Sequence, residues 1–233
     1  MITKYPVYNM GSSDLGWLQS RFHFSFADYF NRNNMNFGVL RVINDDYVQP
    51  KTGFETHPHK NMEIVSYVLD GKLTHKDSMG NEKTLSRGNF QYMSAGTGVF
   101  HSEMNNQSDS VTRLLQIWIF PDEQGLTPNY GDFIYDDAKR KNVFFHAVSS
   151  VKGDAPIKIH QDVNIYVAEL EKGKELDFEV AANRQAYLVQ AEGISDINGT
   201  TLDPRDGLTT VEESLKIKAI EDSHFLIIEM AKV

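Results

Sequence analysis

Two short histidine motifs are the part of this chain best suited to chemistry. His57-Pro58-His59 places two imidazoles two residues apart, and His101-Ser102-Glu103 repeats this spacing with an imidazole and a carboxylate. Residues i and i+2 of a β-strand lie on the same face, so the two side chains of each pair can bind one ion. Neutral imidazoles clustered with a carboxylate suit a first-row divalent metal. We therefore predict a metal site that contains His57, His59 and His101.

The carboxylate ligand of this site has two candidates. Glu103 belongs to the second motif, whereas Glu63 follows the first motif and has the same strand parity as its two histidines. Strand parity allows either residue to point inward, and Glu63 could also support the ligands from behind. The remaining histidines stand alone in the sequence, and we expect them to be surface or core residues: His23, His75, His146, His160 and His224.

The segments around the two motifs must bring them together. Pro58 has no N–H to donate to a neighbouring strand, so the first motif should lie on an edge strand or at the entry to one. A hairpin over residues 64–75, a turn at Gly80, a further strand and the glycine-rich turn 95–98 separate the motifs. These elements can return the chain antiparallel to its start, so the ligands can converge from two strands.

The whole sequence has the pattern of an all-β protein. Short runs rich in Val, Ile, Tyr and Phe are separated by turn signals such as Asp70-Gly71, Arg87-Gly88-Asn89 and Asn198-Gly199. Windows with helical periodicity are hard to find, so helices should be few and short. The alternation of Phe22, Phe24 and Phe26 within the aromatic-rich segment 13–30 predicts a strand there.

A weak internal repeat indicates two copies of one β-unit. Residues 67–71 resemble 187–193, residues 85–88 resemble 202–207, and the run 114–120 resembles 225–230. We therefore predict an N-terminal metal-binding domain over residues 1–130 and a C-terminal domain over 131–233. The link between them should fall within residues 121–141, where Pro, Gly, Asp and Lys are concentrated.

The second copy lacks the predicted ligands. In the repeat, His57 and His59 correspond roughly to Asp177 and Glu179, and the second motif corresponds to Lys216 and Lys218. Residues of opposite charge thus stand where one copy has metal ligands. This correspondence predicts that a buried ion pair replaces the metal in the C-terminal domain.

Composition excludes several other functions. Cysteine is absent, which rules out disulfides, thiolate metal sites and cysteine nucleophiles. The net charge of −9 and the lack of a Lys/Arg cluster oppose direct nucleic-acid binding. No Walker-type loop, dinucleotide fingerprint or serine-hydrolase elbow is present. No apolar run approaches the ~20 residues of a membrane span, and the start lacks the layout of a secretion signal, so we expect a cytoplasmic protein.

The sequence resembles the pirin family of two-domain cupins. The resemblance is carried by Phe54-Glu-Thr-His57-Pro-His59-Lys-Asn-Met-Glu63, Tyr67-Val-Leu-Asp-Gly71, His75-Lys-Asp77-Ser78-Met-Gly80, Gln91-Tyr-Met93-Ser-Ala95-Gly96-Thr-Gly98 and His101-Ser-Glu103. It is strong over the first half of the chain and looser over the second. It implies two double-stranded β-helix (jelly-roll) barrels, and it implies Glu103 as the carboxylate ligand with Glu63 in a supporting role.

The segments Gly16-Trp17-Leu18 and Phe24-Ser-Phe26-Ala-Asp-Tyr29 also resemble a bacterial branch of that family associated with quercetin oxygenation. The resemblance therefore implies a metal-dependent oxidoreductase, a quercetin 2,3-dioxygenase. A flavonol would bind through its 3-hydroxyl, and O2 would open the heterocyclic ring with loss of carbon monoxide. Glu103 would act as the general base that takes the hydroxyl proton. Apolar candidates for the substrate wall are Val65, Tyr67, Phe24, Phe26, Met93 and Phe100.

The metal and the biological role are open at this stage. Iron is the first choice, with nickel, manganese, cobalt or copper as alternatives, while zinc would favour a closed structural site. The alternative function is a non-catalytic, metal-dependent binding or redox-sensing module, like the pirin co-regulators of transcription factors. A sugar isomerase or similar cupin enzyme ranks last, because few polar residues can be placed in the barrel. We expect a monomer or a weakly associated protein.

Overall fold

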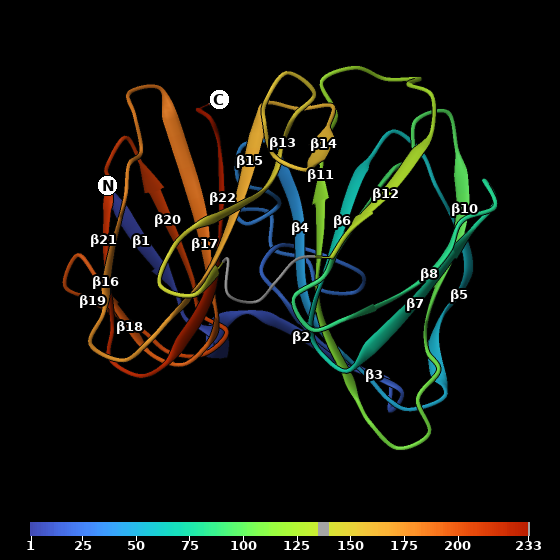
Figure 1. Cartoon of the computed structure of the whole chain (residues 1–233), viewed down its shortest axis with the longest axis horizontal. Coiled ribbons are helices and arrows are strands. Elements are labelled where there is room, and N and C mark those ends of the chain that lie inside the picture. The colour runs from blue at the N-terminus through green and yellow to red at the C-terminus, as the bar shows by residue number, and fades with distance from the viewer. Residues whose placement is uncertain (135–139, 233) are drawn as a thin grey trace. The chain divides into compact units, whose positions relative to one another are not determined.

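The computed structural model describes residues 1–134 and 140–232, and it divides the chain into two compact units. The N-terminal unit comprises Gly11–Tyr135 and Ile159–Gln161, and the C-terminal unit comprises Met1–Met10, Asp136–Lys158 and Asp162–Val233. The described residues lie almost entirely in β-strands and in the turns between them, with a 3-10 turn at Val7–Asn9 (Figure 1). The predicted all-β class is confirmed. No helix of this part of the chain is long and apolar enough to cross a membrane.

Two antiparallel sheets form the N-terminal unit. Its strands are β2 (Gly11–Asp14), β3 (Leu18–Phe22), β4 (Leu40–Val48), β5 (Thr52–His59), β6 (Glu63–Asp70), β7 (Lys72–Asp77), β8 (Glu82–Ser86), β9 (Phe90–Ser94), β10 (Val99–Asn105), β11 (Thr112–Ile119) and β12 (Asn129–Phe133). The larger sheet has the order β12-β9-β6-β11-β4-β3-β2, and the smaller sheet has the order β5-β10-β7-β8.

The C-terminal unit repeats this arrangement. Its strands are β1 (Ile2–Tyr5), β13 (Phe145–Ser150), β14 (Ile157–Ile159), β15 (Val163–Leu170), β16 (Glu175–Phe178), β17 (Arg184–Glu192), β18 (Ser195–Ile197), β19 (Thr200–Leu202), β20 (Gly207–Val211), β21 (Leu215–Ala219) and β22 (Ser223–Ala231). Their orders are β1-β20-β17-β22-β15-β13-β14 and β16-β21-β18-β19. Strands β6, β11, β5 and β10 thus correspond to β17, β22, β16 and β21, as the sequence repeat predicts.

The first strand of the chain belongs to the second unit. β1 pairs antiparallel with β20, so Met1–Met10 packs with residues far along the chain. The division into an N-terminal domain over residues 1–130 and a C-terminal domain over 131–233 stays a prediction. The compact units are not continuous in sequence, because a chain end can supply an edge strand to a sheet formed elsewhere.

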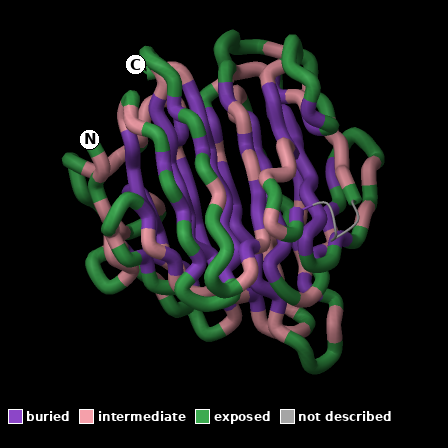
Figure 2. Tube along the Cα trace, turned by 60° about the vertical axis from the view of Figure 1, so that its left-hand side comes forward, coloured by how far each residue is buried: buried purple, intermediate pink, exposed green. Residues whose placement is uncertain are grey.

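The central strands of both larger sheets carry the core. β6, β11, β17 and β22 are buried along almost their whole length, and more than half of the residues of each strand are apolar. Figure 2 shows this burial as purple tube along the strands, with exposed green segments at the turns. The turn signals of the sequence are confirmed, since Gly71, Gly88 and Gly199 have positive φ angles of 73°, 82° and 83°.

The predicted strand through Phe22, Phe24 and Phe26 is only partly correct. β3 ends at Phe22, and the chain then enters a loop in which the Ser25 hydroxyl bonds the carbonyl oxygens of Asn31 and Asn34 at 2.9 and 3.1 Å. These side chain to backbone bonds satisfy groups that a strand ladder would otherwise use. Phe26 therefore leaves the sheet, and its ring packs edge-on against Trp118.

Gly53 is required for the close approach of β5 to β10, and we predict that Gly53→Ala destabilises the protein by about 1–3 kcal/mol. A Cβ at this position would lie 2.3 Å from the Glu103 carbonyl oxygen and 2.6 Å from the Met104 Cα. The measurement is the free energy of unfolding in urea. Thr56→Ala is the control, because its side chain is exposed on the same strand. An equal loss in both variants would show that the close approach is not the role of Gly53.

Candidate metal centre

The two histidine motifs lie side by side on β5 and β10. The strands are antiparallel, with His57 opposite His101, Pro58 opposite Phe100 and His59 opposite Val99. β5 is the edge strand of its sheet, as the missing N–H of Pro58 predicts. The register shifts by a β-bulge between His101 and Glu103. Bulges of this kind re-aim side chains next to functional sites.

Three imidazole rings meet between these strands. The ring centroids of His57 and His101 are 4.5 Å apart, and each lies 4.9 Å from that of His59. Nε2 of His101 lies 3.0 Å from Nε2 of His57. Nδ1 of His57 lies 2.7 Å from the Glu55 carbonyl oxygen, which can only accept. His57 therefore carries its proton on Nδ1 and presents the lone pair of Nε2 to the other two rings.

The electrostatics of the cluster keep these rings available as ligands. Burial, followed by the neighbouring His101 and His57, lowers the pKa of His59 to about 4. Burial, followed by His57 and His75, lowers the pKa of His101 to about 3. Nδ1 of His101 is buried without a hydrogen-bond partner among the described residues. Neutral imidazoles with a buried unpartnered nitrogen fit a divalent metal ion.

Glu103 is buried next to this cluster and is held by neutral donors. Its Oε1 accepts hydrogen bonds from the Ser66 hydroxyl at 2.8 Å and from the Gln91 amide at 2.9 Å. Its Oε2 accepts from the Gln116 amide at 2.6 Å. The carboxylate is grouped with ligand atoms of His101 and His75, all within 4.8 Å of one another. The structure thus brings Glu103 beside His101, while the three-histidine group comprises His57, His59 and His101.

His75 is the site residue that the sequence placed among the isolated histidines. It is fully buried, its Nε2 lies 3.1 Å from Asp77 Oδ2, and its ring stacks on Tyr130 at 4.7 Å. β7 pairs with β10 so that His75 lies opposite Glu103 and Asp77 lies opposite His101. The spacing of His75 and Asp77 along the predicted hairpin repeats that of the two motifs. This repeated spacing was the signal that could have identified His75.

Glu63 lies outside both histidine groups. It is fully buried, with its carboxylate accepting from the Ser94 hydroxyl at 2.6 Å and from the His160 backbone N–H at 3.2 Å. Burial raises the pKa of Glu63. Its parity with His57 and His59 was misleading, because the chain bends at Asn61, which has a φ of 50°, and Glu63 begins a strand of the other sheet.

The same bend also changes which residues of β6 face the metal centre. Ser66 faces Glu103, so Val65 and Tyr67 lie on the opposite face of the strand and cannot line the site. Ile64 is on the site face, where it packs with Met93 and Val99. Trp118, which the sequence analysis missed, contacts His59 edge-on at 4.9 Å. Phe100 is 55% exposed and points away from the core.

The C-terminal unit has an apolar interior at the corresponding strands. Asp177 and Lys216 lie opposite each other on β16 and β21, but both are exposed. Leu215, Ile217 and Phe178 point inward and join the hydrophobic core. The predicted buried ion pair is therefore wrong, because the repeat alignment was one residue out of phase and placed the charged residues on the inner face.

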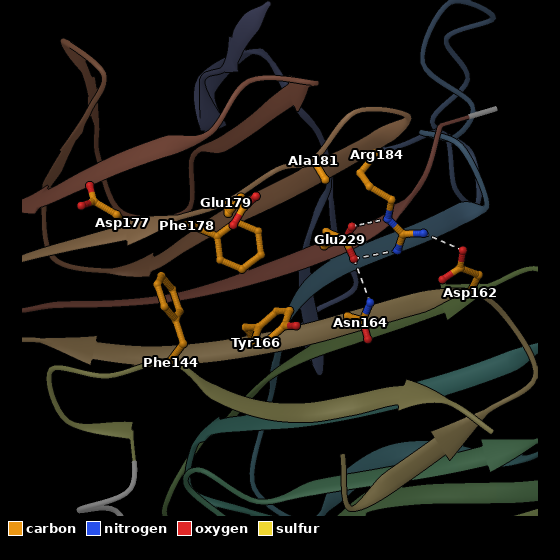
Figure 3. A pocket seen from close by; sticks show the side chains of 10 residues that line it. All are labelled: Phe144, Asp162, Asn164, Tyr166, Asp177, Phe178, Glu179, Ala181, Arg184 and Glu229. Atoms are coloured by element: carbon orange, nitrogen blue, oxygen red, sulfur yellow. Dashed lines mark hydrogen bonds and ion pairs between the residues drawn. The ribbon is translucent and has the colours of Figure 1, made fainter. Parts of the chain in front are cut away.

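A polar network lies elsewhere in the C-terminal unit, at a cavity of about 620 Å³ (Figure 3). Arg184 bridges Glu229, through Nε and Nη2, and Asp162, through Nη1. Asn164 donates to Glu229 Oε2 at 2.8 Å. Glu229 and Asp162 raise the pKa of Arg184 through hydrogen bonds and charge. This internally paired network shows how the barrel accommodates these charged side chains.

Two repeated antiparallel barrels define the two-domain cupin class, and among the described residues the histidine and carboxylate cluster that suits a metal lies in the first barrel. Residues 6–119 match the family described as Pirin, and residues 147–230 match the family described as Quercetinase C-terminal cupin domain. The chain belongs to the pirin family.

Relatives and solved structures cover the entire chain. The chain is 42% identical to a quercetin 2,3-dioxygenase of Escherichia coli over 100% of both proteins, and 40% identical to a pirin-like protein of Caulobacter vibrioides over 99% and 100%. The E. coli protein YhhW has a TM-score of 0.95 at 40% identity, covering 100% of this chain and 99% of that one. A nickel(II) complex of YhhW has a TM-score of 0.94 at 39% identity, covering 100% of both chains. That complex and the cluster support a divalent metal.

Acid should destabilise the metal-free protein through the buried imidazoles. His59 and His101 have lowered pKa values in the folded state, so between pH 6.5 and about 4 the unfolded chain binds more protons. The contribution of these two imidazoles to the free energy of unfolding is therefore fully present above pH 6.5, and it is lost as the pH decreases towards their folded-state pKa values. We expect a loss on the order of 2–4 kcal/mol between pH 7 and pH 5. Urea unfolding at both pH values measures it, and His101→Asn should reduce the slope.

Arg184→Met should cost about 2–3 kcal/mol of stability, because it leaves the Glu229 carboxylate, 8% exposed, without its partner. Lys216→Met is the matched control at an exposed position and should change stability by less than about 0.5 kcal/mol. Thermal and urea unfolding measure both. Recovery of stability in Arg184→Met combined with Glu229→Leu would assign the loss to the unpaired carboxylate, and no recovery would contradict that assignment.

Proposed function

We propose that this protein is a metal-dependent dioxygenase of the quercetin 2,3-dioxygenase type, with His57, His59, His101 and Glu103 as the metal ligands. The observation that carries the proposal is the convergence of three imidazoles beside one buried carboxylate. The relatives named as quercetin 2,3-dioxygenases support it, because they match over the full length of the chain. The substrates would be a flavonol and O2.

The donor set leaves a divalent ion with residual positive charge, because three imidazoles are neutral and one carboxylate supplies a single negative charge. Held by His57, His59, His101 and Glu103, such an ion would supply Lewis acidity to a flavonol hydroxyl and would leave coordination positions open for the substrates. Iron is our first choice, since a catalytic site needs those open positions. Nickel, manganese, cobalt and copper meet the same requirement, whereas zinc tends towards a closed tetrahedral site.

Glu103 is proposed to take the proton of the flavonol 3-hydroxyl as general base. Ser66, Gln91 and Gln116 fix the orientation of its carboxylate without neutralising it, because all three are uncharged donors. Glu103 held in this way keeps its position when it takes up or releases a proton. The indole ring of Trp118 against His59 and the side chains of Ile64 and Met93 give the site an apolar surround that excludes water.

The test combines metal content by elemental analysis with loss of quercetin followed by absorbance and detection of carbon monoxide. Wild-type protein should contain one equivalent of metal and consume quercetin. His59→Ala should lose metal and turnover together. His146→Ala, in the C-terminal unit, is the matched control and should retain both.

Glu103→Gln tests the proposed base. We expect turnover to fall by about 10²- to 10⁴-fold, with a smaller effect on metal content, because the imidazoles remain. Full oxygenase activity in this variant would remove Glu103 as the base. One equivalent of metal with no flavonol turnover, and a spectrum that changes reversibly with oxidant, would instead support the metal-dependent sensing module.

A further inference from the structure

A second cavity lies in the N-terminal unit beside the metal centre. Its volume is about 320 Å³, at the lower end of the range for small-molecule sites. The loop that follows β3 and the end of β11 form its walls. We call it the aromatic pocket, after the five rings that line it: Phe26, Tyr29, Phe30, Trp118 and Phe120.

Two rings of this pocket are held in place by their surroundings, and two others are exposed to solvent although aromatic side chains usually pack in a core. The Tyr29 ring lies against Gly11, where a Cβ would approach it to 2.3 Å. Phe26 and Tyr29 form an isolated antiparallel bridge around a tight turn. Phe30 is 74% exposed and Phe120 is 40% exposed. Exposed aromatic side chains gathered around one hollow are typical of a ligand site.

Trp118 supplies an unused hydrogen-bond donor. Its Nε1 is buried, and it has no hydrogen-bond partner among the residues that the structure describes. A buried donor without a partner is unfavourable, and such groups often await a ligand or an ordered water. The other contacts of the indole are edge-on with Phe26 at 5.5 Å and with His59 at 4.9 Å.

Arg41 supplies a positive charge at the same pocket. Its Nη1 donates to the carbonyl oxygens of Ser25 at 2.8 Å and Met35 at 3.0 Å. Within the described part of the chain no carboxylate pairs with this guanidinium, although the protein carries a net charge of −9. The two backbone bonds hold the guanidinium in place and leave its charge uncompensated. Charge complementarity therefore favours an anion.

We propose that the aromatic pocket binds a small planar aromatic anion, an arene carboxylate or a phenolate. The ring packs against Phe26, Tyr29 and Trp118, and the oxygens accept from Trp118 Nε1 and face Arg41. The proposal does not depend on the oxygenase activity, because none of these groups is a proposed metal ligand. Since His59 packs against the same indole, an occupied pocket would lie next to the metal centre.

The test uses benzoate as the probe and benzamide as its neutral match, with the full-length protein as purified. The chain has two tryptophans, so Trp17→Phe leaves Trp118 as the only fluorophore of its type. Benzoate should change the Trp118 emission saturably, and benzamide should bind at least about tenfold more weakly, because it lacks the charge that Arg41 recognises. Acetate should give no change, since it lacks the ring.

Methionine methyl NMR gives a second readout that does not require a tryptophan. The methyl groups of Met35 and Met62 line the pocket, whereas Met104 lines a separate hollow beside Trp17 and serves as the internal control. Benzoate should shift the first two signals and not the third. Trp118→Phe, which keeps a ring but removes the N–H, should weaken binding by about 2- to 10-fold.

Arg41→Met should abolish the preference for benzoate over benzamide, while Arg41→Lys should retain part of it. Thermal unfolding of both variants checks that the loop is intact, and the lysine variant keeps the test valid if the methionine variant unfolds. Unchanged Met35 and Met62 signals with benzoate, or a benzoate affinity that Arg41→Met leaves unaltered, would overturn the proposal. Failure of quercetin turnover would leave it standing, because the two experiments share no readout.

Discussion

Burial of the Glu103 carboxylate is the constraint around which the N-terminal barrel is organised. A charge removed from water needs full hydrogen bonding, and Glu103 obtains it from Ser66 on β6, Gln91 on β9 and Gln116 on β11. Glu103 itself lies on β10, in the other sheet. The interaction therefore joins the two sheets of the barrel and fixes β10 in the register that places His101 opposite His57.

Burial also determines the charge state of the neighbouring histidine cluster. Burial keeps His59 and His101 uncharged, with pKa values lowered to about 4 and 3, so their nitrogen lone pairs are free near neutral pH. A carboxylate oriented by hydrogen bonds and imidazoles retained as neutral bases are what a divalent ion requires. The same environment thus prepares both kinds of ligand before the metal arrives.

The second barrel has the same strand order as the first but different side chains at the corresponding interior positions. Gln116 lies between Ser66 and Asn44 in the first unit, and Glu229 lies between Ala186 and Asn164 at the corresponding place in the second. Where the first unit binds a carboxylate from β10, the second pairs its own carboxylate with Arg184. Leu215 and Ile217 then provide apolar side chains on the strand that corresponds to β10. The carboxylate of Glu229 is thus paired by a cation of the protein itself.

The sequence by itself determined the all-β class, the repeat and the two histidine motifs, because strand parity and turn glycines act over a few residues. It also placed Pro58 on an edge strand, since a missing N–H has the same consequence in any sheet. The tertiary structure decided what lies between strands. The bend at Asn61 turned Glu63, Val65 and Tyr67 away from the site, and the pairing of β7 with β10 brought His75 into it. The rule that residues i and i+2 share a face holds only within one strand. It fails where the chain passes from one sheet to the other, so the positions of these residues depend on strand pairing between distant parts of the chain.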